Sequence, residues 1–315
     1  MRVGSLPMLY ALIAAGFLFL GGCAPQPKMV AFKPMTSEIS TEENATEKLA
    51  DMSLETLLSK GSTYLAEGDL PLARLHLFKA LTLAPDNIKV YQGLGELFLK
   101  MNQLKKAQTA YAEILKINPE NEIALFGLGK AYRLEGDCVA AGNYLQQAEK
   151  LSPDNPDVLT EMAICYDKLE QSAQAEELYL RVAELQPVNP SSFNNLGFHY
   201  LIEGVYQPAI DAFLTGERLK PEDRRIRNNL AAAYILNGDE AQGLARFESS
   251  IGKAGAFNNV GYIYMVQNRW SKAEEAFVKA LELNPSYYVK AAKNLDYLRR
   301  LSAYQNMRTA GPEGE

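Results

Sequence analysis

Residues suited to chemistry are sparse in this 315-residue chain, which has two histidines and three cysteines. His76 and His199 are far apart, and neither has a Cys or His neighbour at the spacing of a metal site, which needs three or four ligands. The sequence contains no phosphate-binding loop, nucleophile elbow or HExxH motif. We therefore expect no metal, no cofactor and no catalytic residues. An enzyme with an unrecognised site is the remaining alternative, which turnover by the purified protein would reveal.

Cys23 follows a short apolar segment at the start of the chain. Arg2 gives a basic start and residues 7–20 are mostly apolar, a stretch too short for a permanent membrane span. Residues 20–23 read LGGC and resemble the bacterial lipobox. The resemblance implies that residues 1–22 are a lipoprotein signal peptide and that Cys23 carries acyl chains such as palmitate. The alternative is an ordinary secretory signal with an incidental cysteine.

Residues 23–50 read as a lipidated flexible tether. They are rich in Pro, Thr, Ser, Glu and Lys without apolar periodicity, and a coil of this length spans about 30 Å. The residue after the cysteine is Ala24 rather than Asp, which by the sorting rule of bacterial lipoproteins indicates the outer membrane, facing the periplasm. The formal net charge is −6, and this argues against nucleic acid and leaves the lipid anchor as the contact with the membrane.

The rest of the chain repeats a 34-residue pattern that spaces small and apolar residues over two helices. Counted from residue 190, positions 4, 7, 8, 11, 20, 24 and 32 hold Phe193, Leu196, Gly197, Tyr200, Ala209, Phe213 and Pro221. Matching residues recur in the units that begin at residues 54, 88, 122 and 156. Positions 4, 7, 8 and 11 share one helix face, positions 20 and 24 share one face of the next helix, and proline ends that helix. The pattern resembles the tetratricopeptide repeat.

Two further units follow the first five. Residues 224–253 form a unit four residues short, with Gly243 at position 20 and no closing proline. We expect its second helix to be short, with Gly252 and Gly255 making the turn. Residues 254–287 restore the pattern, 288–306 are expected to form a capping helix, and 307–315 a disordered tail.

The resemblance implies an all-α, right-handed superhelical solenoid of about seven helix-turn-helix repeats and a C-terminal capping helix over residues 51–306. Neighbouring repeats must stack, because one unit cannot bury both of its faces. In this family the first helices line a concave groove.

Paired asparagines occupy groove positions in the last three repeats. Positions 5 and 6 hold Asn194 and Asn195, Asn228 and Asn229, and Asn258 and Asn259, while Phe198 and Tyr262 stand at position 9. An amide both donates and accepts, so it can pair with a peptide backbone in either direction. We expect these eight residues to form a peptide-binding groove. The alternative is that the asparagines at position 6 only bond the neighbouring helix.

Two cysteines lie in helices that should be neighbours. Cys138 begins the second helix of the third repeat, and Cys165 lies late in the first helix of the fourth. Because the periplasm is oxidising, a disulfide between them is one hypothesis, and two small core residues are the other.

The lipobox, the tether, the repeats and the run RIRNNLAAAYILNGDEAQGLARFESSIGKAGAFNNVGYIYM resemble the TadD family of lipoproteins of the tight-adherence (Flp) pilus assembly system. The resemblance implies a pilotin-like assembly factor whose protein partner is a secretin or another pilus-assembly component. The second class of function is a general envelope scaffold, an adaptor for cell-wall hydrolases or for outer-membrane protein assembly.

Overall fold

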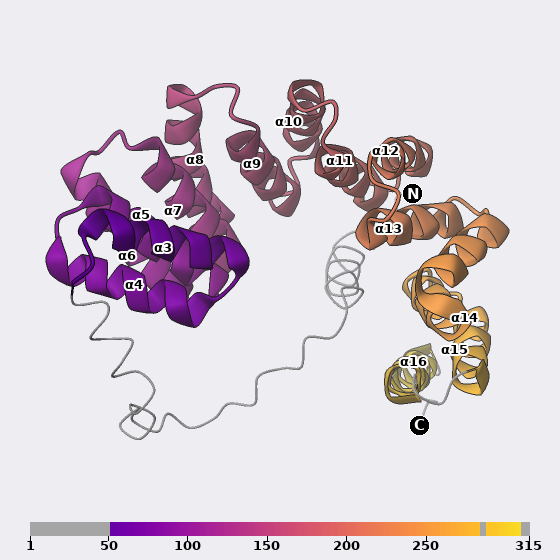
Figure 1. Cartoon of the computed structure of the whole chain (residues 1–315). Helices are drawn as coiled ribbons and strands as arrows, with labels where there is room; N and C mark the ends of the chain where they lie inside the picture. Colours follow the sequence, from indigo (N-terminus) through magenta and orange to yellow (C-terminus); the bar gives the residue numbers. More distant parts are fainter. Residues whose placement is uncertain (1–50, 284–287, 310–315) are drawn as a thin grey trace, which may run out of the picture. The chain divides into compact units, whose positions relative to one another are not determined.

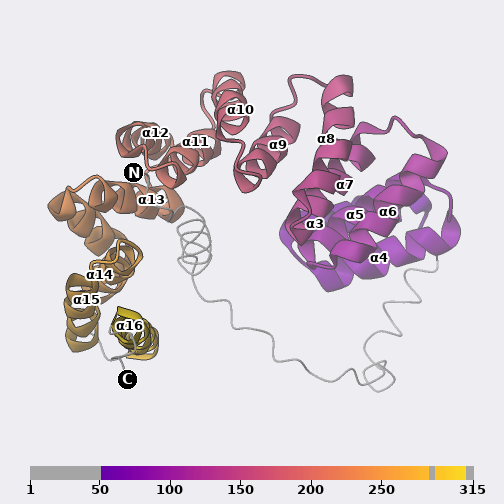
Figure 2. The ribbon, with the colours of Figure 1, turned by 180° about the vertical axis from the view of Figure 1, so that it is seen from behind.

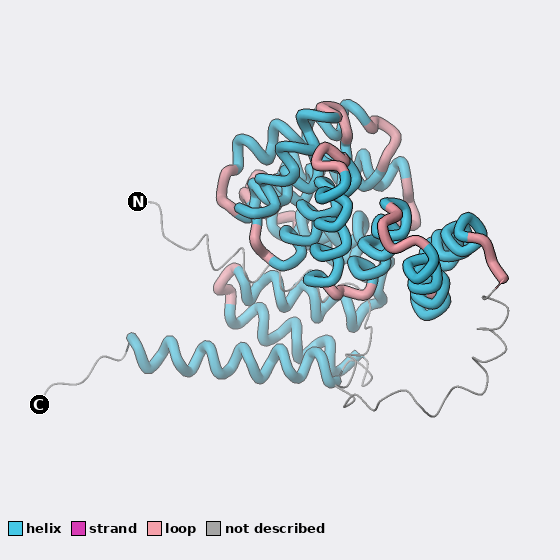
Figure 3. Tube along the Cα trace, turned by 90° about the vertical axis from the view of Figure 1, so that its left-hand side faces the viewer, coloured by secondary structure: helices cyan, strands magenta, loops and turns pink. Residues whose placement is uncertain are grey.

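The computed structural model describes residues 51–283 and 288–309, and every regular element in these ranges is an α-helix (Figure 3). The expected signal peptide (1–22), the tether (23–50) with Cys23, and residues 310–315 of the expected tail lie outside the described residues. Among the helices described, none combines the length and the apolar character needed to cross a membrane. The structure divides into two compact units between Leu185 and Gln186, and the single repeat domain over residues 51–306 stays a prediction.

The first unit contains eight described helices, which pack in chain order, each against the next (Figure 1). They are α3 (Leu54–Glu67), α4 (Leu70–Leu83), α5 (Ile88–Lys100), α6 (Leu104–Ile117), α7 (Glu122–Glu135), α8 (Cys138–Leu151), α9 (Pro156–Lys168) and α10 (Ser172–Leu185). The first helices of successive repeats also touch, α3 with α5, α5 with α7 and α7 with α9. These helices therefore fall two by two into the first four predicted repeats.

The second unit contains six described helices, which follow one another in the same way and can be traced from behind in Figure 2. They are α11 (Pro190–Ile202), α12 (Tyr206–Leu219), α13 (Arg224–Leu236), α14 (Glu240–Val266), α15 (Trp270–Leu283) and α16 (Tyr288–Thr309). Here α11 touches α13, and α14 touches α16. The capping helix was expected to stop at residue 306, but α16 continues to Thr309, so residues 307–309 belong to the helix and not to the tail.

The helices begin at short polar side chains that recur with the repeat. Asn and Asp side chains accept a backbone N–H of the first turn and so satisfy donors that the helix leaves unpaired. Before the first helices of repeats two to six these residues are Asn87, Asn121, Asn155, Asn189 and Asp223. Before second helices, Asp69, Asp137 and Asp239 act in the same way. The repeat pattern thus fixes helix starts as well as helix faces.

The first helices end at a left-handed residue in all seven repeats. At position 15 the chain has Gly68, Asn102, Gly136, Glu170, Gly204, Gly238 and Asn268, each with positive φ. Glycine adopts this conformation without steric cost, and other residues do so at a cost of about 1–2 kcal/mol. The tight turn into the second helix therefore depends on this one position.

Glycines also let large side chains cross between helices. The ring of Tyr111 in α6 lies against Gly95 of its own repeat and Gly127 of the next, where an added Cβ would come within 2.5 Å and 2.4 Å of its Cζ atom. Leu77 lies in the same way between Gly61 and Gly93. Position 6 is therefore small in repeats two and three because the preceding second helix fills that space.

Helix α14 joins two predicted repeats through a single break. Only Gly252 within it is non-helical, with φ 78° and ψ 164°, a region that is essentially restricted to glycine. The predicted break at Gly252 is confirmed. The same expectation for Gly255 is wrong, because Gly255 is buried inside the helix that restarts after the break.

Candidate protein-binding surfaces

The asparagines of the expected groove lie on first helices of the second unit and are largely covered. Asn194 and Asn195 in α11 are half-buried. Asn228 and Asn229 in α13, and Asn258 and Asn259 in α14, are at most 9 % exposed. Most of these amides thus lie among packed helices, where a polar group needs a hydrogen-bond partner.

Three of the six amides take part in hydrogen bonds between helices. Asn229 Nδ2 donates to Asn194 Oδ1 at 2.9 Å and so joins α13 to α11. Asn258 Oδ1 accepts from Asn294 Nδ2 at 3.0 Å, which joins α14 to α16. For Asn229 the structure agrees with the alternative interpretation, a bond to the neighbouring helix. Peptide binding by the set stays a prediction.

Two amide atoms of the same set have no partner among the described residues. Asn228 Oδ1 and Asn259 Nδ2 are both buried and unpaired. A buried group without a hydrogen bond costs about 1–3 kcal/mol. A bound peptide or a water molecule would supply the missing hydrogen bonds to this acceptor and this donor.

The two aromatic members of the expected groove are more accessible than the buried asparagines. Phe198 in α11 and Tyr262 in α14 are half-buried. Burial, and then the nearby Tyr297, raise the pKa of Tyr262, so its hydroxyl stays protonated and able to donate. Tyr297 in α16 is 45 % exposed. These rings are the apolar part of the expected groove, and a polypeptide contact with them stays a prediction.

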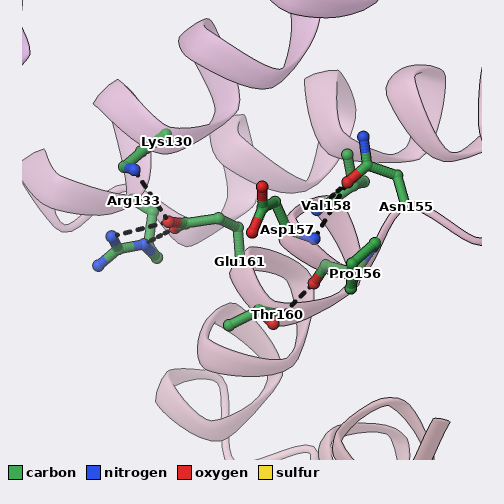
Figure 4. Close-up of polar contacts among 8 residues, drawn as sticks. All are labelled: Lys130, Arg133, Asn155, Pro156, Asp157, Val158, Thr160 and Glu161. Atoms are coloured by element: carbon green, nitrogen blue, oxygen red, sulfur yellow. Dashed lines mark hydrogen bonds and ion pairs between the residues drawn. The ribbon is translucent and has the colours of Figure 1, made fainter. Parts of the chain in front are cut away.

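A charged cluster joins two first helices of the first unit. Figure 4 shows Lys130 and Arg133 of α7 directed at the carboxylate of Glu161 in α9. Arg133 Nε donates to Glu161 Oε2, and Arg133 Nη2 to Oε1 at 3.3 Å, while Lys130 Nζ lies 3.9 Å from Oε1. The Arg133 and Glu161 side chains are 15 % and 10 % exposed. Removing one partner of such a buried pair costs about 3–5 kcal/mol.

The start of α9 holds Glu161 in place. Asn155 Oδ1 accepts the backbone N–H of Asp157 at 3.0 Å, and Thr160 Oγ1 donates to Pro156 O at 2.7 Å (Figure 4). These bonds fix the first turn of the helix from which Glu161 projects toward α7. This cluster was not among the predicted site residues, although opposite charges at groove positions of successive repeats indicate it in the sequence.

Lys130 is the member of the cluster that remains accessible. Its side chain is 39 % exposed, and its Nζ atom lies 5.7 Å from the centre of the Phe126 ring. The cluster therefore holds α7 against α9 and presents one ammonium group beside an aromatic ring.

Cys138 and Cys165 are buried free thiols in the structure, not a disulfide. They are nevertheless neighbours, because burial and, after it, a hydrogen bond with Cys138 raise the pKa of Cys165. A raised pKa keeps the thiol protonated and slows its oxidation. The disulfide stays a prediction that an oxidising environment would test.

The histidines have structural surroundings. His76 Nδ1 lies 2.9 Å from Leu72 O, and the ring of His199 packs 5.6 Å from that of Tyr200. Both side chains are buried. Within residues 51–283 and 288–309, no group of three His, Cys, Asp or Glu side chains is arranged to hold a metal ion.

Family models described as tetratricopeptide repeat match residues 64–132, 132–196 and 254–287, which together make up more than half of the chain. A search of the curated proteins finds no significant match.

Several solved structures have a similar fold. A tetratricopeptide repeat protein from Parabacteroides merdae ATCC 43184 is 20% identical with a TM-score of 0.58, and the match covers 78% of this chain and 98% of that one. PilW, described as a widely conserved type IV pilus biogenesis factor, is 18% identical with a TM-score of 0.60, over 66% of this chain and 97% of that one. PilF of Pseudomonas aeruginosa is 18% identical with a TM-score of 0.54, over 65% and 91%. With the family models, this likeness confirms the predicted all-α repeat solenoid.

Proposed function

The chain belongs to the tetratricopeptide-repeat family, and we propose that it is a non-catalytic, lipid-anchored assembly factor for a pilus secretion machinery. The repeat fold is typically a scaffold that binds other proteins. The family models matched here do not indicate a catalytic family.

The observation that carries the proposal is the likeness of the repeat array to PilW along almost the whole of that protein. PilW is a type IV pilus biogenesis factor, and PilF has a similar fold. The lipobox at Cys23 and the tether after it add an outer-membrane anchor, as expected of the Flp pilus lipoproteins that the sequence resembles. On this proposal the partner is a secretin or another pilus-assembly component.

The partner would lie along the first helices. In the second unit these helices present Phe198 and Tyr262 beside the asparagines, and in the first unit they present Lys130 beside Phe126. Aromatic rings supply contact area, and amides and the ammonium group supply hydrogen bonds. No bond in the partner needs to be made or broken.

The test is a pull-down of the tagged full-length protein from chemically crosslinked outer membranes. We expect a secretin or a pilus-assembly subunit in the eluate. The Cys23→Ser variant should leave the membrane fraction and lose that partner, because its acyl chains are gone. Recovery of cell-wall hydrolases or of outer-membrane protein assembly factors instead would favour the envelope scaffold. Membrane retention of the Cys23→Ser variant would contradict the anchor.

A further inference from the structure

Arg227 stands at a position that holds apolar side chains in the other repeats, three of them fully buried. Position 4 holds an aliphatic or aromatic residue in the six other repeats: Leu57, Tyr91, Leu125, Leu159, Phe193 and Phe257. In the sixth repeat it holds Arg227, which is half-buried on α13. A guanidinium group replaces a core side chain only where the surroundings can hydrate it or bond it.

The shortened sixth repeat provides such surroundings for the Arg227 guanidinium group. Its second helix, the first half of α14, breaks at Gly252, and Arg227 Nη2 donates to Ser249 O near this end at 3.2 Å. Beside them lies an open pocket of about 880 Å³ between α12, the Pro221 turn, α13 and α14. The whole pocket is formed by the second compact unit.

The pocket contains two arginines without a carboxylate partner. Arg218 donates to Thr215 Oγ1 at 3.0 Å, and neither Arg218 nor Arg227 forms an ion pair with any described residue. Each guanidinium group carries five N–H donors. Most of these donors thus stay free for an anion.

The acids of the pocket are engaged elsewhere. Glu217 accepts both of its bonds from Arg246 Nη1, at 2.9 Å each, and Asp211 accepts from Gln207 at 3.0 Å. Their charges still lie at the pocket wall, so a doubly charged anion is repelled more than a singly charged one.

We propose that this pocket is a second binding site, which takes a carboxylate group of a polypeptide. The forked N–H donors of arginine match the geometry of a carboxylate. Leu214 and Pro221 form an apolar part of the pocket wall, which suits the carbon atoms that carry the carboxylate. The carboxylate comes from a Glu or Asp side chain or from a chain terminus. The site lies on α12, α13 and the first half of α14, and its lining includes none of the eight residues of the expected groove.

The test measures fluorescence anisotropy of labelled peptides with the full-length protein in detergent micelles. The probes are an amidated peptide of alternating Leu and Glu, the same peptide with Gln for Glu, and the Gln peptide with a free carboxyl terminus. We expect one carboxylate peptide to bind about tenfold or more tightly than the amidated Gln peptide, since a hydrogen bond to a charged group contributes about 1.5–3 kcal/mol. The two carboxylate probes distinguish a side chain from a terminus. Equal affinity of all three overturns the proposal.

Variants assign the binding to this pocket. Arg227→Leu introduces a residue that other repeats carry at position 4, and we expect it to lose the carboxylate preference, whereas Arg227→Lys keeps part of it. The matched control is Arg74→Leu, an exposed arginine of α4 that does not line the pocket. Unchanged preference in the folded Arg227→Leu variant, verified by circular dichroism, overturns the assignment. Displacement of the Glu peptide by inorganic phosphate, but not by an equal concentration of acetate, overturns the choice of a carboxylate.

Discussion

At the residue scale, small side chains at fixed positions decide how closely the helices pack. The ring of Tyr111 lies against Gly95 and Gly127, and burial raises the pKa of its hydroxyl well above the usual range. Since protein interiors are close-packed, an atom added against this ring must displace it.

Replacing Gly127 by alanine should therefore destabilise the protein. The new Cβ would lie 2.4 Å from Tyr111 Cζ, and overpacking of this kind costs about 1–3 kcal/mol. The control is Gly142→Ala in α8, where an added Cβ meets nothing within 4 Å and alanine should be neutral or stabilise the helix by about 0.5–1 kcal/mol. Urea denaturation measures both variants. Equal stabilities would show that the ring moves aside without cost.

The repeat positions of single residues could be predicted from the sequence, but their partners could not. The spacing placed Asn229 and Asn194 on first helices, yet only the structure shows that one bonds the other. Arg227 was visible as a departure at position 4, whereas its bond to Ser249 depends on where the short helix ends. Side-chain partners in a stacked array come from the next repeat, and sequence spacing within one repeat does not specify them.

At the element scale, the sixth repeat joins the seventh through α14 and through Glu240. Tyr264 donates to Glu240 Oε2 at 2.6 Å, Arg269 Nη2 lies 2.5 Å from Oε1, and Lys272 Nζ lies 3.3 Å from Oε1. The hydrogen bond from Tyr264, and then that from Arg269, lower the pKa of Glu240 to about 2. The break at Gly252 was readable from the sequence because a missing proline and four missing residues mark it. The Glu240 cluster was not, since it joins residues of two repeats.

The free energy of unfolding should fall as the pH is lowered, because Glu240 is stabilised in its charged form in the folded protein. Its folded-state pKa is depressed, so the stabilisation is fully present above the ordinary value of 4.5 and is lost as pH falls toward 2. We expect the urea midpoint of the wild type to drop more between these pH values than that of Glu240→Gln. Glu222→Gln, at an exposed turn residue, should keep the wild-type slope. Identical slopes for all three proteins would exclude a role for Glu240.

At the scale of the whole molecule, the repeat family, helix order and register could be read from the sequence, because each repeat restates the same spacing. The division between Leu185 and Gln186 could not, since the fourth and fifth repeats both follow the pattern closely. Membership in the tetratricopeptide-repeat family makes protein binding the general expectation. The central claim is more specific: a partner polypeptide lies along the first helices.

Residue-specific photo-crosslinking in cells tests that claim most directly. A benzoylphenylalanine placed at Phe198 or Tyr262 keeps an aromatic side chain on a first helix, and the same residue at Tyr206 marks the second helix α12 as a control. We predict that positions 198 and 262 crosslink to one protein partner of the envelope and that position 206 does not. Crosslinks to that partner from position 206 alone, with none from positions 198 and 262, would contradict the account.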